Sequence, residues 1–361
     1  MDWKTDRLSR RLTFTAEQSE TLFAIIAEID AIKNAFRLSG RLLPQTISRL
    51  TQSVIVTSTG ASNRIEGNRL TDDEVEALYR NLRIRRLRTR DEQEVAGYLE
   101  TLERILDSYA DMPLTEGLVL QLHSDMLKHS EKDQRQRGAY KFGPNRVEAK
   151  DPSGHVVGVI FDPTPPHLTP KEVQELIAWL RWAESESFKH PLIRIASFVF
   201  EYLAIHPFQD GNGRTSRLLT NLLLLQQGYM FTALVSHEKL IEARKADYYL
   251  ALAQAQSSWK TEHEDIYPWV LYFLEIVTAQ ATQALAIIEA DRIESLLSEK
   301  QLALWQWAQG RNQPAFSRKD AVEALGFPMR TVEATIKKLV ELKRLERIGQ
   351  GRATRYRVVR G

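Results

Sequence analysis

Hydrophobic residues recur along most of this chain at the three- and four-residue spacing of amphipathic helices. The spacing is clear in residues 17–38, in residues 92–110 and in KEVQELIAWL at 171–180. Two further stretches, 192–205 and 218–227, are apolar on nearly every side, which is typical of helices buried within a bundle. We therefore predict a mainly α-helical fold.

One segment breaks this pattern: residues 143–166, GPNRVEAKDPSGHVVGVIFDPTPP. Proline and glycine punctuate it, and short strand-like runs lie on both sides of residues 151–154. The segment predicts a β-hairpin with its turn at 151–154. We expect a helical body that carries this one small hairpin.

The bulk composition is that of an ordinary globular protein, with 43% hydrophobic and 27% charged residues, and the 361 residues suit two or three domains. The absence of cysteine excludes disulfides and thiolate metal sites and fits a reducing compartment. We find neither the apolar core of a signal peptide nor a run that approaches the roughly 18 apolar residues of a membrane span. We expect a cytoplasmic protein that does not contact membranes.

The net charge of +2 is unevenly distributed, because residues 311–361 hold 13 Lys/Arg against 5 Asp/Glu. This change in charge along the chain predicts a separate C-terminal module. Ser317 can cap a short helix, residues 330–345 form a longer amphipathic one, and residues 344–359 are expected to form a hairpin. The order resembles a winged helix, whose basic charge suits contact with DNA, although a protein-interaction or dimerisation module is the alternative.

The segment HPFQDGNGRTSR, residues 206–217, places polar chemistry between two apolar helices. Backbone N–H groups at a helix N-terminus lack partners and carry partial positive charge. Glycine lets such a backbone approach an anion closely. We therefore predict that Gly211, Asn212 and Gly213 cradle a phosphate at the start of the second helix.

The charged side chains of this segment suit a polyphosphate and its metal. Arg214 and Arg217 are three residues apart and share a helix face, so both can reach phosphate oxygens. Asp210 can hold the Mg²⁺ that such phosphates bring. His206 can accept a proton near neutral pH.

Residues 206–217 match the signature HxFx(D/E)GNGRxxR of the Fic family at every fixed position, and the chain resembles that family over about residues 45–275. Members mostly transfer AMP from ATP to a protein hydroxyl. YKFGPNRV at 140–147, with the hairpin after it, resembles the family's substrate-binding flap. The run at 190–208 resembles the helix that leads into the active loop.

The resemblance implies a role for each residue of the motif. His206 is the general base that deprotonates a Ser, Thr or Tyr hydroxyl, Phe208 anchors the loop, and Asp210 holds Mg²⁺. Arg217 contacts the γ-phosphate. The residues that the resemblance assigns to phosphate binding are Gly211, Asn212, Gly213, Arg214, Thr215, Ser216 and Arg217.

Two regions outside the motif also gain roles from the resemblance. Tyr248 matches an aromatic residue of the nucleoside-contacting helix, and Gln256 stands where several relatives carry asparagine. In the flap, the backbone would hold a target segment as an added strand, and the residues concerned are Gly158, Val159, Ile160 and Phe161.

A second short motif lies at 62–67, SNRIEG. Ser62 and Glu66 are four residues apart and share a helix face, and SxxxEG matches the family's inhibitory motif [ST]xxxE[GN]. The resemblance implies that Glu66 pairs with Arg217, which leaves ATP in a non-productive pose. The alternative is a surface glutamate in a helical hairpin, whose next helix begins at a capping box of Thr71 and Glu74.

These features predict four regions. They are an N-terminal helical region at 1–110 with the inhibitory helix near 57–67, a Fic catalytic core at 111–280, a helical linker at 281–310 and a winged-helix-like domain at 311–361.

The leading function hypothesis is a protein adenylyltransferase that uses ATP and Mg²⁺, acts on a protein hydroxyl (its own included) and is held inhibited by Glu66. One alternative is removal of AMP, with Glu66 orienting water. Another is a DNA-binding regulator whose Fic core senses nucleotide. The kinase-like branch is disfavoured because this chain keeps the glycines and the second arginine. The sequence also allows a homodimer.

Overall fold

The computed structural model describes residues 2–38, 44–82, 87–150, 156–294, 297–311, 315–349 and 354–359. The chain divides into two compact units. One unit contains residues 1–40 and 47–284, and the other contains residues 41–46 and 285–361.

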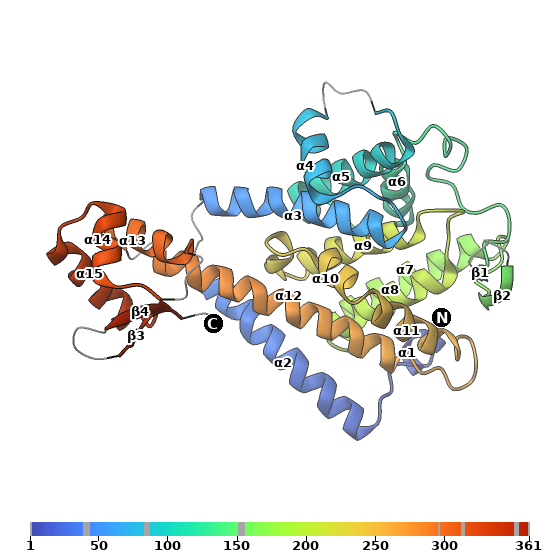
Figure 1. Ribbon diagram of the computed structural model, residues 1–361. Coiled ribbons are helices and arrows are strands. Elements are labelled where there is room, and N and C mark those ends of the chain that lie inside the picture. The colour runs from blue at the N-terminus through green and yellow to red at the C-terminus, as the bar shows by residue number, and fades with distance from the viewer. Residues whose placement is uncertain are drawn as a thin grey trace. The chain divides into compact units, whose positions relative to one another are not determined.

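The long helices up to residue 294 follow the predicted periodicity. In chain order the helices of this part are α1 (Arg7–Arg10), α2 (Ala16–Leu38), α3 (Pro44–Ile65), α4 (Asp72–Asn81), α5 (Arg90–Ser108), α6 (Glu116–Met126), α7 (Thr169–Ser185), α8 (Pro191–Ile205), α9 (Asn212–Gln226), α10 (His237–Ala243), α11 (Lys245–Gln256) and α12 (Tyr267–Glu294). Two short 3₁₀ helices, Tyr109–Asp111 and Met230–Ala233, lie between them. The prediction of a mainly helical fold is confirmed (Figure 1).

The core of the first unit is built on α8 and α9. Almost every residue of both helices is buried, because α7 packs on α8 while α5 and α6 pack on α9. This explains why the sequence of both helices is apolar on nearly every side. The loop that joins them is therefore held between two fixed elements (Figure 1).

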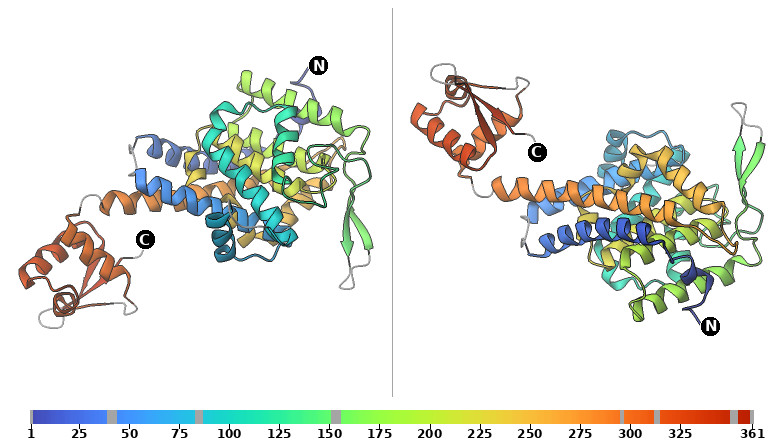
Figure 2. Two further views of the ribbon diagram at one scale, coloured as in Figure 1. Left: turned by 90° about the horizontal axis from the view of Figure 1, so that it is seen from above. Right: turned by 90° about the horizontal axis from the view of Figure 1, so that it is seen from below.

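The predicted hairpin consists of β1 (Val147–Lys150) and β2 (Val156–Phe161), which are antiparallel. Val147 pairs with Phe161 and Ala149 pairs with Gly158. The hairpin projects from the helical body (Figure 2). The turn expected at 151–154 lies outside the described residues.

Helix α12 corrects one expectation. Its residues 267–290 are long and apolar enough to cross a membrane by length and composition alone, whereas no such run was expected from the sequence. Half of this window is buried inside the protein. The indole Nε1 of Trp269 donates to the Ala196 carbonyl at 2.8 Å, and Gln280 donates to the Val235 carbonyl at 2.7 Å. These contacts are those of a core helix.

The second unit has its own elements and core. Its elements are α13 (Glu299–Gln309), α14 (Arg318–Leu325), α15 (Met329–Glu341), β3 (Leu345–Ile348) and β4 (Arg355–Val358). Ser317 caps α14 in a capping box, as predicted, and β3 pairs with β4 in antiparallel register. Phe316 pairs with Tyr356 and so extends the hairpin by one bridge.

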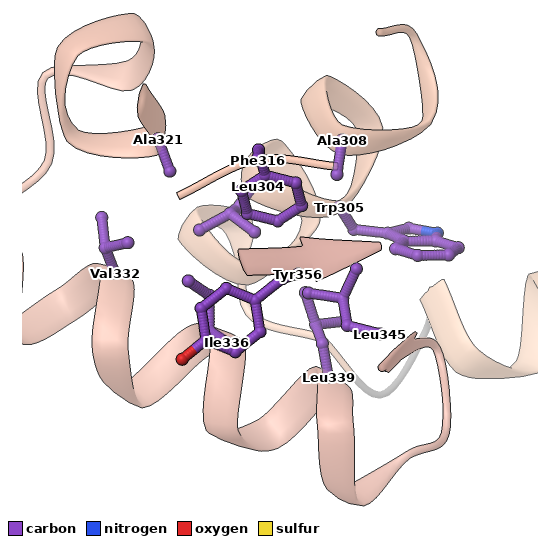
Figure 3. Packing of buried hydrophobic residues seen from close by; sticks show 10 residues of the cluster. All are labelled: Leu304, Trp305, Ala308, Phe316, Ala321, Val332, Ile336, Leu339, Leu345 and Tyr356. Carbon is purple, nitrogen blue, oxygen red and sulfur yellow. The ribbon is translucent and has the colours of Figure 1, made fainter. Parts of the chain in front are cut away.

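The core of this unit includes a helix that the sequence places in a linker. Buried side chains from α13, α14, α15 and the hairpin meet in one cluster (Figure 3): Leu304, Trp305, Ala308, Phe316, Ala321, Val332, Ile336, Leu339, Leu345 and Tyr356. Residues 299–309 are therefore part of this core. The sequence shows their amphipathic pattern but not the surface that they cover.

Candidate active site

The loop between α8 and α9 turns sharply at both ends. His206 ends α8 in the left-handed conformation, at φ 53°. Gly211 precedes α9 at φ 81°, and a Cβ at that position would lie 2.7 Å from Met126 Cε. The backbone angle favours glycine at 211, whereas Met126 Cε is the end of a flexible side chain and could move. These two residues give the loop its shape.

The loop is also closed on itself. The side chain of Asn212 accepts from the Phe208 N–H at 2.8 Å and donates to the Phe208 carbonyl at 2.8 Å. Phe208 is fully buried and stacks on His123 with a centroid distance of 3.7 Å. Asn212 therefore shapes the loop with its side chain, so that only its backbone is left to face a ligand.

His123 is a functional residue that the sequence analysis missed. Its Nδ1 accepts from the Gly138 N–H at 3.1 Å, so its Nε2 carries the proton and donates to the Asp210 carbonyl at 3.0 Å. Burial lowers the pKa of His123 to about 4 and keeps the ring neutral. A lone histidine on the buried face of α6 gives no signal of this role in the sequence.

Two residues of the YKFGPNRV segment, Asn145 and Lys141, also hold the loop, a role that the sequence did not reveal. The amide of Asn145 donates to the carbonyls of His206 and Phe208 at 2.9 and 2.7 Å. The ammonium of Lys141 donates to the Ile205 carbonyl at 2.9 Å, at the C-terminus of α8, where positive charge is favourable. The YKFGPNRV segment thus fixes the active loop as well as leading into the hairpin.

His206 is placed to act as a base. Its Nδ1 lies 3.2 Å from the Leu203 carbonyl and must donate to it, which leaves Nε2 with a free lone pair. Burial lowers the pKa of His206 to about 4, and the neighbouring Lys141 acts in the same direction. The imidazole is therefore neutral at pH 7 and able to accept a proton.

Arg214 lies buried beside the N-terminus of α9. Its Nη1 is 3.4 Å from Glu94 Oε2, and its Nη2 is 3.6 Å from Asp210 Oδ2. Among the described residues, nothing accepts a hydrogen bond from its Nε or Nη1. Buried guanidinium N–H groups without acceptors are costly unless an anion supplies them. The site thus has donors to offer to a phosphate.

Arg217 and the 62–66 motif meet as the resemblance implies. The Arg217 Nε donates to Ser62 Oγ at 2.8 Å, and its Nη2 donates to the Ser62 carbonyl at 3.0 Å and to Glu66 Oε1 at 2.8 Å. A Cβ on Gly213 would lie only 2.3 Å from Glu66 Oε1. The Glu66 carboxylate therefore lies directly against Gly213, one of the residues of the predicted phosphate cradle.

The ion pair fixes the charge of both partners. Burial alone would raise the pKa of Glu66, but the Arg217 guanidinium brings it below its usual range. Arg217 is 2% exposed, and its pKa is raised by Glu66 despite its burial. Both groups are charged at neutral pH.

Thr215 and Ser216 bond with their hydroxyls within the first turn of α9. Thr215 is fully buried and donates its hydroxyl to the Gly211 carbonyl at 2.9 Å. Ser216 donates its hydroxyl to the Gly213 carbonyl at 2.7 Å. The contact of both residues with phosphate stays a prediction.

Asp210 lies in a group of carboxylates that could hold a divalent cation. Its Oδ1 accepts from the Gly211 N–H at 2.6 Å, and its side chain is 44% exposed. Oxygens of Glu94 and Asp133 lie within 4.8 Å of the Asp210 carboxylate and of each other. Arg90 Nη2 is 3.4 Å from Asp210 Oδ2. The donor set is all oxygen, which suits Mg²⁺.

The expected nucleoside and flap residues lie on neighbouring elements, since β2 lies against α11. Tyr248 is buried, and Gln256 at the end of the same helix is partly buried. Phe161 is buried with its ring centroid 5.3 Å from that of Trp259. The backbones of Gly158, Val159 and Ile160 lie within β2, while the side chains of Val159 and Ile160 lie outside the described part of the chain.

Known proteins share this fold. Residues 113–224 match the Fic/DOC family. The solved structure of a Fic family protein from Desulfovibrio desulfuricans G20 aligns over 97% of this chain and 98% of its own, at a TM-score of 0.61 and 26% identity. That of a Fic domain-containing signalling protein from Bacteroides thetaiotaomicron VPI-5482 aligns over 77% of this chain and 99% of its own, at a TM-score of 0.59 and 25% identity.

One curated relative has an enzymatic activity in its name. Protein adenylyltransferase Fic of Nematostella vectensis is 27% identical over 214 residues, which make up 58% of this chain and 44% of that protein. The chain spans less than half the length of the curated relatives that it matches.

Proposed function

Residues 113–224 form a domain of the Fic/DOC family, and from this premise we propose that the protein is an adenylyltransferase. It transfers AMP from ATP to the hydroxyl of a serine, threonine or tyrosine in a protein. The observation that carries this proposal is the neutral His206, whose free Nε2 lies on the loop that leads directly into the N-terminus of α9.

In the transfer step, His206 Nε2 takes the proton of the target hydroxyl. The hydroxyl oxygen forms a bond to the α-phosphorus, the bond from that phosphorus to the oxygen bridging the α- and β-phosphates breaks, and pyrophosphate leaves. The products are the AMP-modified protein, pyrophosphate and a protonated His206. Rigid placement of the base contributes as much as its basicity, and His123, Asn145 and Asn212 supply that rigidity.

The phosphates of ATP would lie over Gly211–Gly213 and accept from Arg214, whose Nε makes no hydrogen bond with any described residue and whose Nη1 lies 3.4 Å from Glu94 Oε2. Asp210 would hold Mg²⁺, with Glu94 and Asp133 close enough to assist directly or through water. The cation would neutralise phosphate charge while the chain's own residues position the hydroxyl and take its proton.

We propose further that Glu66 inhibits the transfer. Its carboxylate covers Gly213 and engages Arg217, the residue that the motif assigns to the γ-phosphate. An anion already on the cradle competes with phosphate for the same donors. ATP would then bind in a pose that does not present its α-phosphorus to the acceptor.

Isotopic labelling tests the reaction. The Glu66→Gly variant is incubated with ATP labelled in the α-phosphate or in the γ-phosphate, and labelled protein is separated by electrophoresis. Protein-bound label is expected from the α position alone. Label from the γ position alone would mean phosphate transfer and would overturn the proposal.

A second candidate function belongs to the C-terminal unit, which we propose is a winged helix that binds duplex DNA. Helix α15 buries Val332, Ile336 and Leu339 and exposes Arg330, Lys337 and Lys338 on its other side. Two glutamates, Glu333 and Glu341, are also exposed on this helix. An amphipathic helix that presents three cations, followed by a hairpin, suits the major groove and its phosphates.

Fluorescence anisotropy with a labelled duplex tests this candidate. We expect binding that weakens with salt and falls about tenfold when Lys337 and Lys338 are both changed to Glu. Lys171→Glu, an exposed position in the first unit, serves as the control. Equal binding by the double variant and the wild type would contradict the proposal.

A further inference from the structure

The inhibitory carboxylate lies one residue beyond the end of α3. The turn there is closed by three backbone bonds: Glu66 and Asn68 donate to the Asn63 carbonyl at 3.1 and 3.0 Å, and Gly67 donates to the Arg64 carbonyl at 3.1 Å. Gly67 has φ 97°, which favours glycine. This local geometry fixes the turn but not its position against Arg217. That position depends on what holds the end of α3.

Arg64 makes several of the side-chain contacts that hold the end of α3, beside the Lys245 ammonium, which donates to the Ile65 carbonyl at 2.6 Å, and the bonds from Arg217 to Ser62. Its Nε is 2.6 Å from Glu242 Oε1, and its Nη2 is 3.2 Å from Glu242 Oε2. Lys239 reinforces the same carboxylate from one turn earlier in α10, at 3.0 Å. The two cations bring the pKa of Glu242 below its usual range, although its partial burial acts in the opposite direction. Glu242 is therefore an anion that binds the end of α3 to α10.

The same guanidinium also reaches the segment after the turn. Its Nη2 is 2.7 Å from Asp72 Oδ1, and its Nη1 donates to the Leu70 carbonyl at 2.9 Å. A Cβ on Gly60 would lie 2.6 Å from both Arg64 Nη1 and Asp72 Oδ1. The guanidinium therefore lies across α3 at Gly60, and all three of its nitrogens are engaged.

Side-chain hydrogen bonds also hold α10 against α9, the helix that carries Arg217. The buried Glu238 accepts from the Asn221 amide at 2.5 Å, and the same amide donates to the Arg217 carbonyl at 3.0 Å. Glu238 also accepts from the Tyr98 hydroxyl at 2.9 Å. A chain of contacts thus runs from Arg217 through Asn221, α10 and Glu242 to Arg64.

We propose that Arg64 is the positioning residue of the inhibition: its pair with Glu242 sets the end of α3 so that Glu66 meets Arg217. The proposal rests on the proposed function. It assigns α10 as the element on which release of the inhibition would act, because loss of the Glu242 charge loosens the end of α3, which keeps its bonds to Lys245 and Arg217, and leaves Glu66 and the active loop chemically unchanged.

The geometry also predicts a moderate effect. Arg64 and Glu242 have side-chain exposures of 20% and 23%, against 3% for Arg217. Partly exposed ion pairs are screened by water and contribute less than buried ones. Loss of the Arg64–Glu242 pair should weaken the contact of Glu66 with Arg217 rather than abolish it. We therefore expect a gain in AMP transfer of about 3- to 10-fold.

The test is a double-mutant cycle of Glu242→Gln with Glu66→Gly. Glu242→Gln keeps the size of the side chain and removes its charge. Transfer of α-label from ATP is measured in the wild type, both single variants and the double variant. Glu100→Gln is the control, because it removes a partly exposed ion pair, with Lys128, that joins α5 to the segment after α6 and involves neither α3 nor α10. Hydrogen exchange of the Glu66, Gly67 and Asn68 amides gives a readout that does not depend on activity.

We expect Glu242→Gln to raise labelling about 3- to 10-fold, to add nothing in the Glu66→Gly background and to speed exchange of the three amides. Glu100→Gln should change neither readout. Unchanged amide exchange in Glu242→Gln would overturn the positioning role, as would an equal gain in the Glu66→Gly background. If no variant transfers label while the amides still exchange faster, the proposed reaction is wrong and the positioning role stands.

Discussion

The two partners of the Arg217–Glu66 pair are held in very different ways. Arg217 is 2% exposed, on a helix whose residues are nearly all buried, and Ser62 accepts two further hydrogen bonds from its guanidinium. Glu66 is 36% exposed in its side chain and lies on a short turn. One partner belongs to the fixed core, whereas the other sits on a segment that partly exposed ion pairs keep in place.

This difference indicates how such a site can be inhibited without being distorted. The catalytic loop keeps its shape through contacts that do not involve Glu66, chiefly those of His123, Asn145 and Asn212. Removal of the carboxylate should therefore free Arg217 and leave the loop as it is. Damage to the loop, in contrast, should remove activity whether or not Glu66 is present.

The largest effect is expected from the base. His206→Ala in the Glu66→Gly background should lower α-label transfer by about 10²- to 10⁴-fold, the usual contribution of a general base. Initial rates at saturating ATP provide the measurement, and thermal melting confirms that the variant is folded. Loss of less than a factor of ten would show that another group takes the proton.

A smaller loss is expected from the contact that orients the loop. His123→Asn removes the stack on Phe208 and the bond to the Asp210 carbonyl, so the loop should shift and kcat should fall by about 10- to 100-fold. His129→Asn is the matched control, because His129 contacts Glu100 on the outer side. If His123→Asn and His129→Asn both retain full kcat, His123 does not orient the loop.

The smallest effect is expected from pH. His206, with its pKa lowered to about 4, is unprotonated at every pH well above that value, so the base is lost only as pH falls through about 4. The kcat/KM of Glu66→Gly should therefore be flat from about pH 5.5 to 7.5. An acidic limb near pH 6.5 would mean that His206 titrates at its ordinary value.

The sequence was informative where one local segment carries the chemistry. The helical pattern predicts α8 and α9, and the motif at 206–217 predicts the loop between them together with its base and its anion cradle. The SNRIEG motif predicts the partner of Arg217 because the resemblance links the two.

Contacts between distant segments could not be predicted in this way. His123 is 87 residues from the carbonyl that it binds, and Glu242 is 178 residues from Arg64. The carboxylates of Glu94 and Asp133 approach Asp210 only when three segments pack together. A histidine or a glutamate in a helix has no periodic signature, so its partner becomes visible only in the folded chain.

The most direct measurement of the central claim compares α-label transfer by the wild type and by Glu66→Gly at equal protein and ATP concentrations. Removal of a carboxylate that competes with phosphate for Arg217 is expected to raise the rate by about 5- to 100-fold, in line with the usual size of coupling between two sites. Equal rates in the two proteins would contradict the account, because they would mean that the Glu66–Arg217 pair does not restrain the reaction.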